Sequence, residues 1–309
     1  MEEVSQKEHS LPIRNIERIQ EICSSLVTHI THDRYGASQE DLTWLETERR
    51  SYRTLRAFYA VERSGRPIPK RKAKLLAERD FAIDKVSEDE TFVASELLDA
   101  LHTTYVYMDE TDPKKAREGT KGQEIEYVNS AVKANIEFAD FFIKIHQRFN
   151  LKDEDLYSLF DLLFEKAGIT RELEARGLEN FPGGVLAMVR AYLHLSSQLP
   201  NWNMRVPEVQ LDRDHAVDLI AEKKKADVVI ENRYFEIKGR HDTNEVQVTE
   251  ITEKQKKENL KISIILNTRD RKDLERKLAS LDKLFDFASS QGQKGRRVRA
   301  FWVEVPSRA

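Results

Sequence analysis

One stretch of the chain concentrates the residue types that can do chemistry. An aspartate, Asp227, is followed by a glutamate, Glu236, and a lysine, Lys238. Two carboxylates provide the hard oxygen ligands that Mg²⁺ or Mn²⁺ prefers. An ammonium group beside such an ion can orient an attacking water or take its proton. These residue types indicate metal-dependent hydrolysis of phosphodiesters.

The three side chains can meet only if the backbone folds back between them. Two runs of β-branched and aromatic residues, 228–230 and 234–237, predict short strands separated by a polar break. With a two-residue hairpin loop formed by Asn232 and Arg233, Asp227 lies opposite Lys238, and Glu236 shares their face. A loop one residue longer or shorter would separate the acids.

The Glu-any-Lys pattern is not specific by itself, because it occurs at 222–224, 236–238 and 275–277. The first copy lies in a charged turn and the last in a helical pattern. Only the middle copy lies in an apolar strand that follows an acid. A second interpretation stays open, in which these charges merely solvate an exposed hairpin face.

The segment from about 212 to 305 resembles the PD-(D/E)XK nuclease superfamily, which includes many restriction endonucleases, Holliday junction resolvases and repair nucleases. The resemblance rests on the first acid followed by Glu-Ile-Lys. It implies that Asp227, Glu236 and the backbone carbonyl of Ile237 bind magnesium, with Lys238 beside the attacking water. The chain departs from the family at Ala226, where a proline is usual.

The resemblance also implies a further site residue and partners. In that family a helix before the first strand sometimes supplies another acid. Glu172, Glu174 and Glu179 are candidates for it, and their spacing does not choose among them. The substrate implied is double-stranded DNA. A restriction enzyme that cuts both strands needs two sites, so we expect a homodimer.

The elements around the motif predict an α+β or α/β fold with a restriction-endonuclease-like mixed sheet flanked by helices. Residues 216–221 and 245–249 read as strands, and Thr252 with Gln255 predicts a helix start. Residues 261–267 are the most strand-like run and predict a buried central strand. An amphipathic helix over 270–290 and a strand over 298–305 complete the core.

The preceding half is predicted to be mostly helical. Helical periodicity covers the ranges 14–30, 40–61, 69–86, 89–108, 122–149 and 153–167. We therefore expect a helical domain over 1–150, used for DNA grip, specificity or dimerisation, and a nuclease domain over 151–309. A boundary near 177 is the alternative.

Composition sets wider bounds. The chain has 309 residues, a hydrophobic fraction of 39% that permits a core, and a net charge of −3. A single cysteine, Cys23, excludes an internal disulfide framework and fits a reducing compartment. No signal peptide or membrane segment is evident, so we expect a soluble cytoplasmic protein with no membrane partner.

Basic residues slightly outnumber acidic ones after residue 200, by 23 to 19. Candidate DNA contacts are Arg240, Lys254, Arg269 and Arg271. The Arg-Asp-Arg triplet at 269–271 could present guanidinium groups to guanine edges. Alternatively, Asp270 caps the helix that follows.

Together these patterns predict a Mg²⁺-dependent DNA endonuclease, with Mn²⁺ as a possible substitute, of a type II restriction or other defence type. Two alternatives stay open: a non-catalytic nucleic-acid-binding or assembly module that keeps the nuclease fold, and a helical interaction protein whose sheet is only structural. The sequence does not choose the recognition site, or between DNA and RNA.

Overall fold

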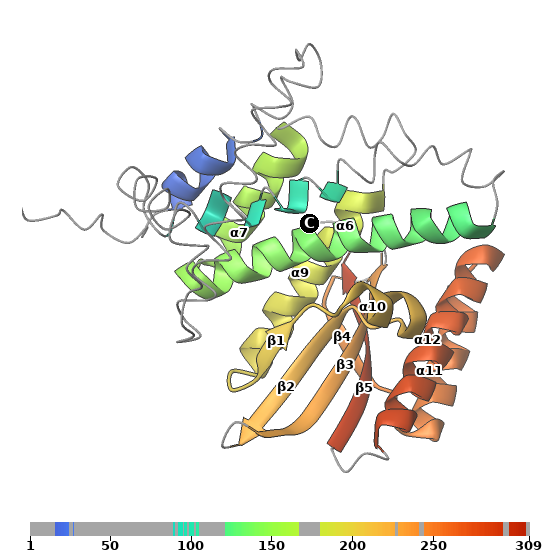
Figure 1. The fold of residues 1–309 in the computed structure, drawn as a ribbon. Coiled ribbons are helices and arrows are strands. Elements are labelled where there is room, and N and C mark those ends of the chain that lie inside the picture. The colour runs from blue at the N-terminus through green and yellow to red at the C-terminus, as the bar shows by residue number, and fades with distance from the viewer. Residues whose placement is uncertain are drawn as a thin grey trace, which may run out of the picture. The chain divides into compact units, whose positions relative to one another are not determined.

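The computed structural model describes residues 16–24, 27, 89, 92–94, 96, 97, 99–101, 103, 104, 121–166, 180–225, 228–240, 244–292 and 297–306. Over these residues the chain is an α+β protein in which helices accompany a five-stranded mixed sheet, as expected for the fold class (Figure 1). None of the helices in these ranges is long and apolar enough to cross a membrane.

The described residues form two compact units, each discontinuous in sequence. One comprises the described residues within 1–101 and 145–169, and the other comprises those within 102–144 and 170–309. Helix α6 (Lys121–Phe149) contributes to both. The expected division into domains 1–150 and 151–309 stays a prediction, because compactness alone assigns no role to either unit.

The first unit is helical where it is described. Cys23 is buried in a helical segment over 16–24, and Gln20 of this segment donates a 2.9 Å hydrogen bond to Ser158 of α7 (Asp153–Asp161). A short π-helical segment, Leu162–Lys166, continues α7. The helices expected over 14–30, 89–108 and 153–167 are confirmed for the residues described, and those over 40–61 and 69–86 lie outside them.

The second unit contains the sheet. Its strands are β1 (Asn203–Arg205), β2 (Leu219–Lys225), β3 (Val228–Arg240), β4 (Gln247–Glu250) and β5 (Arg297–Pro306). They lie in the order β1-β2-β3-β5-β4, with β3 and β5 parallel and the other neighbours antiparallel. Helices α11 (Lys254–Asn267) and α12 (Arg271–Gly292) connect β4 to β5. The 13-residue strand β3 is central, so its side chains have neighbours on both edges.

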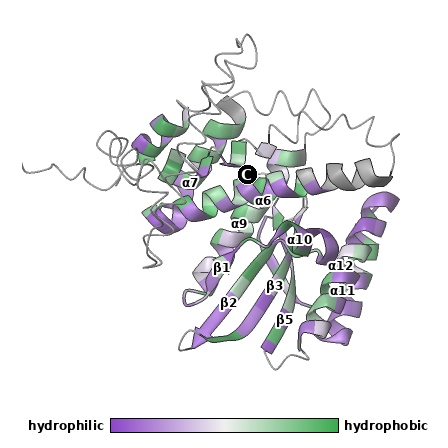
Figure 2. Cartoon of the chain, in the orientation of Figure 1, coloured by the Kyte–Doolittle hydropathy of each residue, from purple (hydrophilic) through white to green (hydrophobic). Residues whose placement is uncertain are grey.

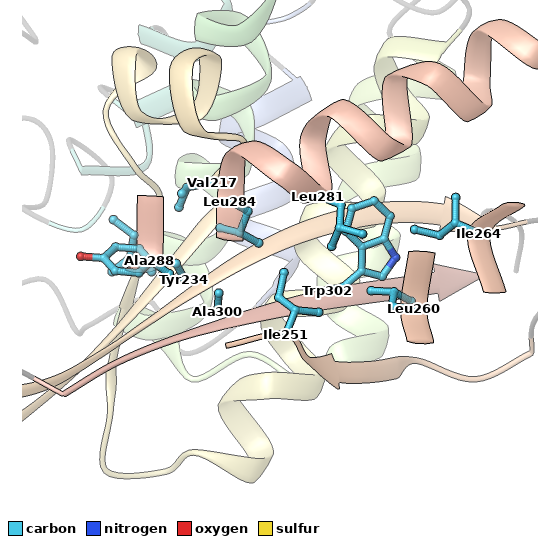
Figure 3. Close-up of a cluster of buried hydrophobic side chains, with 11 residues drawn as sticks. Val217, Tyr234, Ile251, Leu260, Ile264, Leu281, Leu284, Ala288, Ala300 and Trp302 are labelled. Carbon is cyan, nitrogen blue, oxygen red and sulfur yellow. The ribbon is translucent and has the colours of Figure 1, made fainter. Parts of the chain in front are cut away.

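Helices pack on the sheet because its strands alternate two apolar faces. On one face, Tyr234 and Trp302 pack with Leu281 and Leu284 of α12 and with Leu260 of α11 (Figure 3). On the other face, Phe235 and Phe301 stack with ring centroids 5.2 Å apart. Helix α9 (Asn180–Gln198) contacts β3 and β5, and Arg190 of α9 donates a 2.5 Å hydrogen bond to the carbonyl of Pro306.

Three expected strands and one expected helix of this unit are confirmed approximately. Residues 216–221 were expected as a strand and β2 begins at Leu219, while the strand expected over 245–249 is β4. The helix over 270–290 and the strand over 298–305 correspond to α12 and β5. Figure 2 shows the mixture of hydrophilic and hydrophobic residues along α11 and α12 that is typical of helices covering a sheet.

The buried strand expected over 261–267 is wrong, because these residues form the second half of α11. Leu260 and Ile264 are buried four residues apart, whereas Ile262 is 56% exposed. That spacing is helical, and packing on the sheet outweighs the small cost of β-branched residues in a helix. The expected cap is also wrong: Thr252 Oγ1 accepts a 2.8 Å hydrogen bond from the Ala300 amide, and Glu253 is the residue that precedes the helix.

Candidate active site

The hairpin on which the predicted site depended is not formed. Strand β3 runs without a break through 231–233, where the loop was expected, and Glu231 pairs with Lys223 of β2. The chain reverses between Lys225 and Val228, which pair with each other. Val228 is eight residues before Glu236, or about 26 Å along one strand. Asp227 lies outside the described residues, and its part in the site stays a prediction that the strand register no longer supports.

Asp218, immediately before β2, is the acid that lies beside Glu236. Its amide donates a 2.8 Å hydrogen bond to the carbonyl of Phe235. Its Oδ2 accepts a 2.6 Å hydrogen bond from the amide of Ile237. These two contacts bracket Glu236 on β3, so the backbone itself fixes the two carboxylates next to each other.

Glu236 is the most deeply buried carboxylate of the site, with 2% of its surface exposed. It forms an ion pair with Lys238 and accepts a hydrogen bond from Ser280 of α12. Burial raises its pKa to about 7, and the charge of Asp218 also raises it, although Lys238 and the two hydrogen bonds act in the opposite direction. The site therefore holds a carboxylate that gains protons near neutrality when no further cation is present.

Lys238 supplies the positive charge of the site. Burial lowers its pKa, but the negative charges of Glu236 and Asp218 outweigh burial, so its pKa is raised above the ordinary lysine value. Its Nζ lies 5.8 Å from the centre of the Trp302 ring, and Arg276 of α12 repels it. In this arrangement Lys238 is charged, which suits orientation of an anion rather than removal of a proton.

A third carboxylate, that of Asp212 on α10 (Val209–His215), interacts electrostatically with Asp218, Glu236 and Lys238. The helix is followed by Ala216, whose φ of 53° is left-handed and whose amide donates a 2.8 Å hydrogen bond to the Asp212 carbonyl. This turn redirects the chain from α10 into Asp218 within two residues. The pKa of Asp212 is raised to about 9, first by burial and then by the charges of Asp218 and Glu236, whereas Lys238 acts in the opposite direction.

The donor set fits a hard divalent cation. Asp218 and Glu236 offer carboxylate oxygens, and the Ile237 carbonyl points to the same edge of β3 as the Ile237 amide, which binds Asp218. Within the described ranges, no three or more Asp, Glu, His or Cys side chains are gathered as a ready metal site. The groups that could hold a cation are therefore the carboxylates of Asp218 and Glu236 and the backbone carbonyl of Ile237, with Asp212 nearby.

The predicted DNA contacts are spread over the second unit. Arg240 forms a 2.6 Å ion pair with Glu304 of β5. Lys254, the first residue of α11, is exposed, as are Arg269 and Arg271. Asp270, between these arginines, accepts a 2.8 Å hydrogen bond from the Asp273 amide at the start of α12. The capping interpretation of Asp270 is therefore confirmed, and the four DNA contacts stay predictions.

Sequence reasoning missed Asp218 and Asp212. Asp218 carried a usable signal, because it stands at the start of an apolar run, 217–221, that was already expected to be a strand. The sequence signal for Asp212 was weaker, because this residue lies six residues before Asp218 in a short polar segment. The candidates for an upstream acid, Glu172, Glu174 and Glu179, lie outside the described residues.

No protein-family model, no curated protein and no solved structure matches this chain.

Proposed function

We propose that this protein is a metal-dependent nuclease that hydrolyses phosphodiester bonds in DNA. The observation that carries the proposal is the attachment of Asp218 to β3 on both sides of Glu236, with Lys238 ion-paired to Glu236. Two carboxylates and one lysine, with Glu236 and Lys238 on β3 and Asp218 directly before β2, are the groups that the PD-(D/E)XK resemblance requires. Asp218 takes the place in this arrangement that the sequence had suggested for Asp227.

The proposed cation is Mg²⁺ or Mn²⁺, held by Asp218, Glu236 and the Ile237 carbonyl. When bound, such an ion lowers the pKa of water and neutralises charge that develops on the phosphoryl group. Burial, and then repulsion between the carboxylates, raises the pKa values of Asp212 and Glu236, and added positive charge would oppose both effects.

The chain's own residues have separate roles in this proposal. Lys238 keeps its proton and holds the attacking water or a phosphate oxygen by charge. Ser280 fixes the orientation of Glu236 from α12. The Ile237 amide fixes Asp218. A restriction-endonuclease-like fold and a type II restriction or other defence role belong to the same proposal.

The test is plasmid nicking and cutting by the purified protein with Mg²⁺, Mn²⁺ or a chelator. Asp218→Asn, Glu236→Gln and Lys238→Met should each lower cleavage at least about 100-fold, because each removes a charge that acts on the reacting phosphate. Asp227→Asn is the matched control, since it removes a carboxylate from the β2–β3 connection, and should cut like the wild type.

Three results would oppose the proposal or its site assignment. Cleavage that survives Glu236→Gln and Lys238→Met, with folding verified by circular dichroism, refutes the site. DNA binding without cleavage under every metal condition favours instead the non-catalytic module that keeps the nuclease fold. Loss of cutting in Asp227→Asn but not in Asp218→Asn would restore the original assignment.

A further inference from the structure

The sheet face that carries Phe235 and Phe301 changes from apolar to charged towards the β2–β3 turn. Both phenylalanines are buried. Two residues earlier on the same strands stand Arg233 and Arg299, which point to the same face because side chains alternate along a strand. Exposure rises in the same direction, from 27% for the Arg299 side chain to 63% for that of Arg297. This end of the face is therefore charged and open to solvent.

A buried carboxylate gathers the arginines. Glu231 is 8% exposed, and its carboxylate oxygens lie 3.2 Å from Arg233 Nε, 3.4 Å from Arg299 Nε and 3.9 Å from Arg297 Nη1. Arg233 and Arg299 are register partners on neighbouring strands, where like charges repel. One carboxylate holds the three guanidinium groups in place but cancels only one of their charges. Side chains that are already fixed lose little freedom on binding an anion.

An aromatic ring and a second carboxylate extend the cluster. The Arg233 guanidinium lies 4.3 Å from the centre of the Trp202 ring, and Lys223 Nζ lies 5.7 Å from the same centre. Glu250 Oε1 lies 3.6 Å from Arg299 Nη1. Four cations therefore meet the two carboxylates, which leaves two positive charges. We call these four residues the basic surface: Lys223, Arg233, Arg297 and Arg299.

Two further lysines lie beside the basic surface. Lys224 and Lys225 continue β2 towards the turn, and both are exposed. Neither forms an ion pair with another residue in the described ranges. Glu222, earlier on β2, forms a 3.1 Å ion pair with Arg205 and so adds no net charge. Even with Asp227 of the turn counted as a negative charge, positive charge is in excess at this end of the sheet.

We propose that the basic surface binds the phosphate backbone of DNA, apart from the place of cutting. Guanidinium groups match phosphate oxygens in charge and in shape. The strands β2, β3 and β5 span about 10 Å here, because neighbouring strands lie about 4.8 Å apart. One DNA strand presents about three phosphates over that width. A continuous row of anions therefore fits the surface better than the scattered carboxylates of an acidic protein.

The basic surface is distinct from the candidate active site. Arg233 and Glu236 are three residues apart on β3, so their side chains point to opposite faces of the sheet. The DNA segment that the basic surface holds is therefore not the segment beside Glu236. The choice of DNA as the polyanion rests on the proposed function, but binding to this surface requires no cleavage.

Fluorescence anisotropy with a labelled DNA duplex, in chelator and over a series of salt concentrations, tests the proposal. Lys223→Gln combined with Arg297→Gln should weaken binding at least about tenfold and lower the slope of log affinity against log salt by about 2, because two phosphate contacts are lost. Both side chains are exposed, so the sheet should stay folded. Lys133→Gln combined with Lys272→Gln is the matched control, since it removes two exposed cations from α6 and α12, and should bind like the wild type.

Equal losses in the two double variants would show that net charge alone sets the affinity, and would overturn the assignment. Unchanged binding by the variant of Lys223 and Arg297 would overturn it as well. Binding of polyglutamate in place of the duplex would overturn it in favour of an acidic protein. Duplex binding that this variant loses, without any cutting in Mg²⁺, supports the basic surface and opposes the nuclease proposal. Cutting by a protein whose duplex binding is unaffected by the substitutions does the reverse.

Discussion

Replacing Asp212 by asparagine should stabilise the protein at neutral pH. The pKa of Asp212 is raised from 3.8 to about 9, first by burial and then by the charges of Asp218 and Glu236. Asparagine keeps the size and polarity of the side chain and carries no charge. The variant therefore removes the cost of placing an ionisable group in this site.

The sign and size follow from proton linkage. The unfolded chain releases the Asp212 proton near pH 3.8, whereas the folded protein keeps it until about pH 9. Stability is therefore complete below pH 3.8 and falls by about 1.4 kcal/mol per pH unit as pH rises towards 9. At pH 7 the cost reaches about 4 kcal/mol, which is an upper value because Asp212 is only partly buried.

Urea unfolding in chelator, between about pH 4 and pH 9, measures the effect. Asp212→Asn should match the wild type at pH 4 and exceed it by a growing margin above that. Asp273→Asn is a control with the opposite expected sign. Burial raises the pKa of Asp273, but hydrogen bonds from Lys277 and Arg276 outweigh it and lower this pKa. Removal of the Asp273 carboxylate should therefore destabilise the protein at neutral pH. If the Asp212→Asn curve stays parallel to the wild-type curve at every pH, the electrostatic account of the site is refuted.

Three further predictions concern the scaffold. Ile264→Ala should cost about 2–4 kcal/mol in urea unfolding and Ile262→Ala almost nothing, whereas equal costs would indicate a strand, in which both side chains share a face. Thr252→Val should cost about 1–3 kcal/mol by the same assay because it leaves the Ala300 amide without its acceptor, and Thr252→Ser should be nearly neutral. Burial raises the pKa of Cys23, so its thiol should react with a colorimetric thiol reagent only at the rate of unfolding; fast labelling of the native protein would contradict this.

The long periodic patterns of the sequence predicted elements well. An apolar stripe repeated over many residues specifies a helix with little ambiguity, and α6 and α12 correspond to such stripes. The end of the strand that carries Glu236 and Lys238 was also predicted, because β-branched and aromatic residues are concentrated in it. Local patterning was therefore sufficient wherever one element was long and regular.

The turn was mispredicted because the polar run at 231–233 is stabilised largely by residues outside it. Glu231 forms ion pairs with Arg233, Arg297 and Arg299. The Arg233 guanidinium also lies 4.3 Å from the centre of the Trp202 ring. These contacts let charged residues occupy the middle of a strand, and those with Arg297, Arg299 and Trp202 cannot be read from the segment itself.

The failure at α11 has a different cause. A short apolar run does not distinguish a buried strand from a helix, because its length fits both. The preceding residues, Lys254–Leu260, continue into it with helical spacing, and Lys257 is buried beside Leu260 with its Nζ 2.6 Å from Asp282 of α12. Extending the window upstream would have favoured the helix.

The same correction explains why the candidate site can be rigid. Because β3 is continuous, Glu236 and Lys238 lie on a strand that pairs with β5 over their whole stretch and with β2 as far as Phe235. Asp218 is fixed by the backbone of that strand, and Ser280 by a helix whose Leu281 and Leu284 are fully buried. A hairpin tip at 232–233 would have had one unpaired edge and no such support. Conservative substitutions of these charges should therefore change the chemistry of the site while the sheet that carries it stays folded.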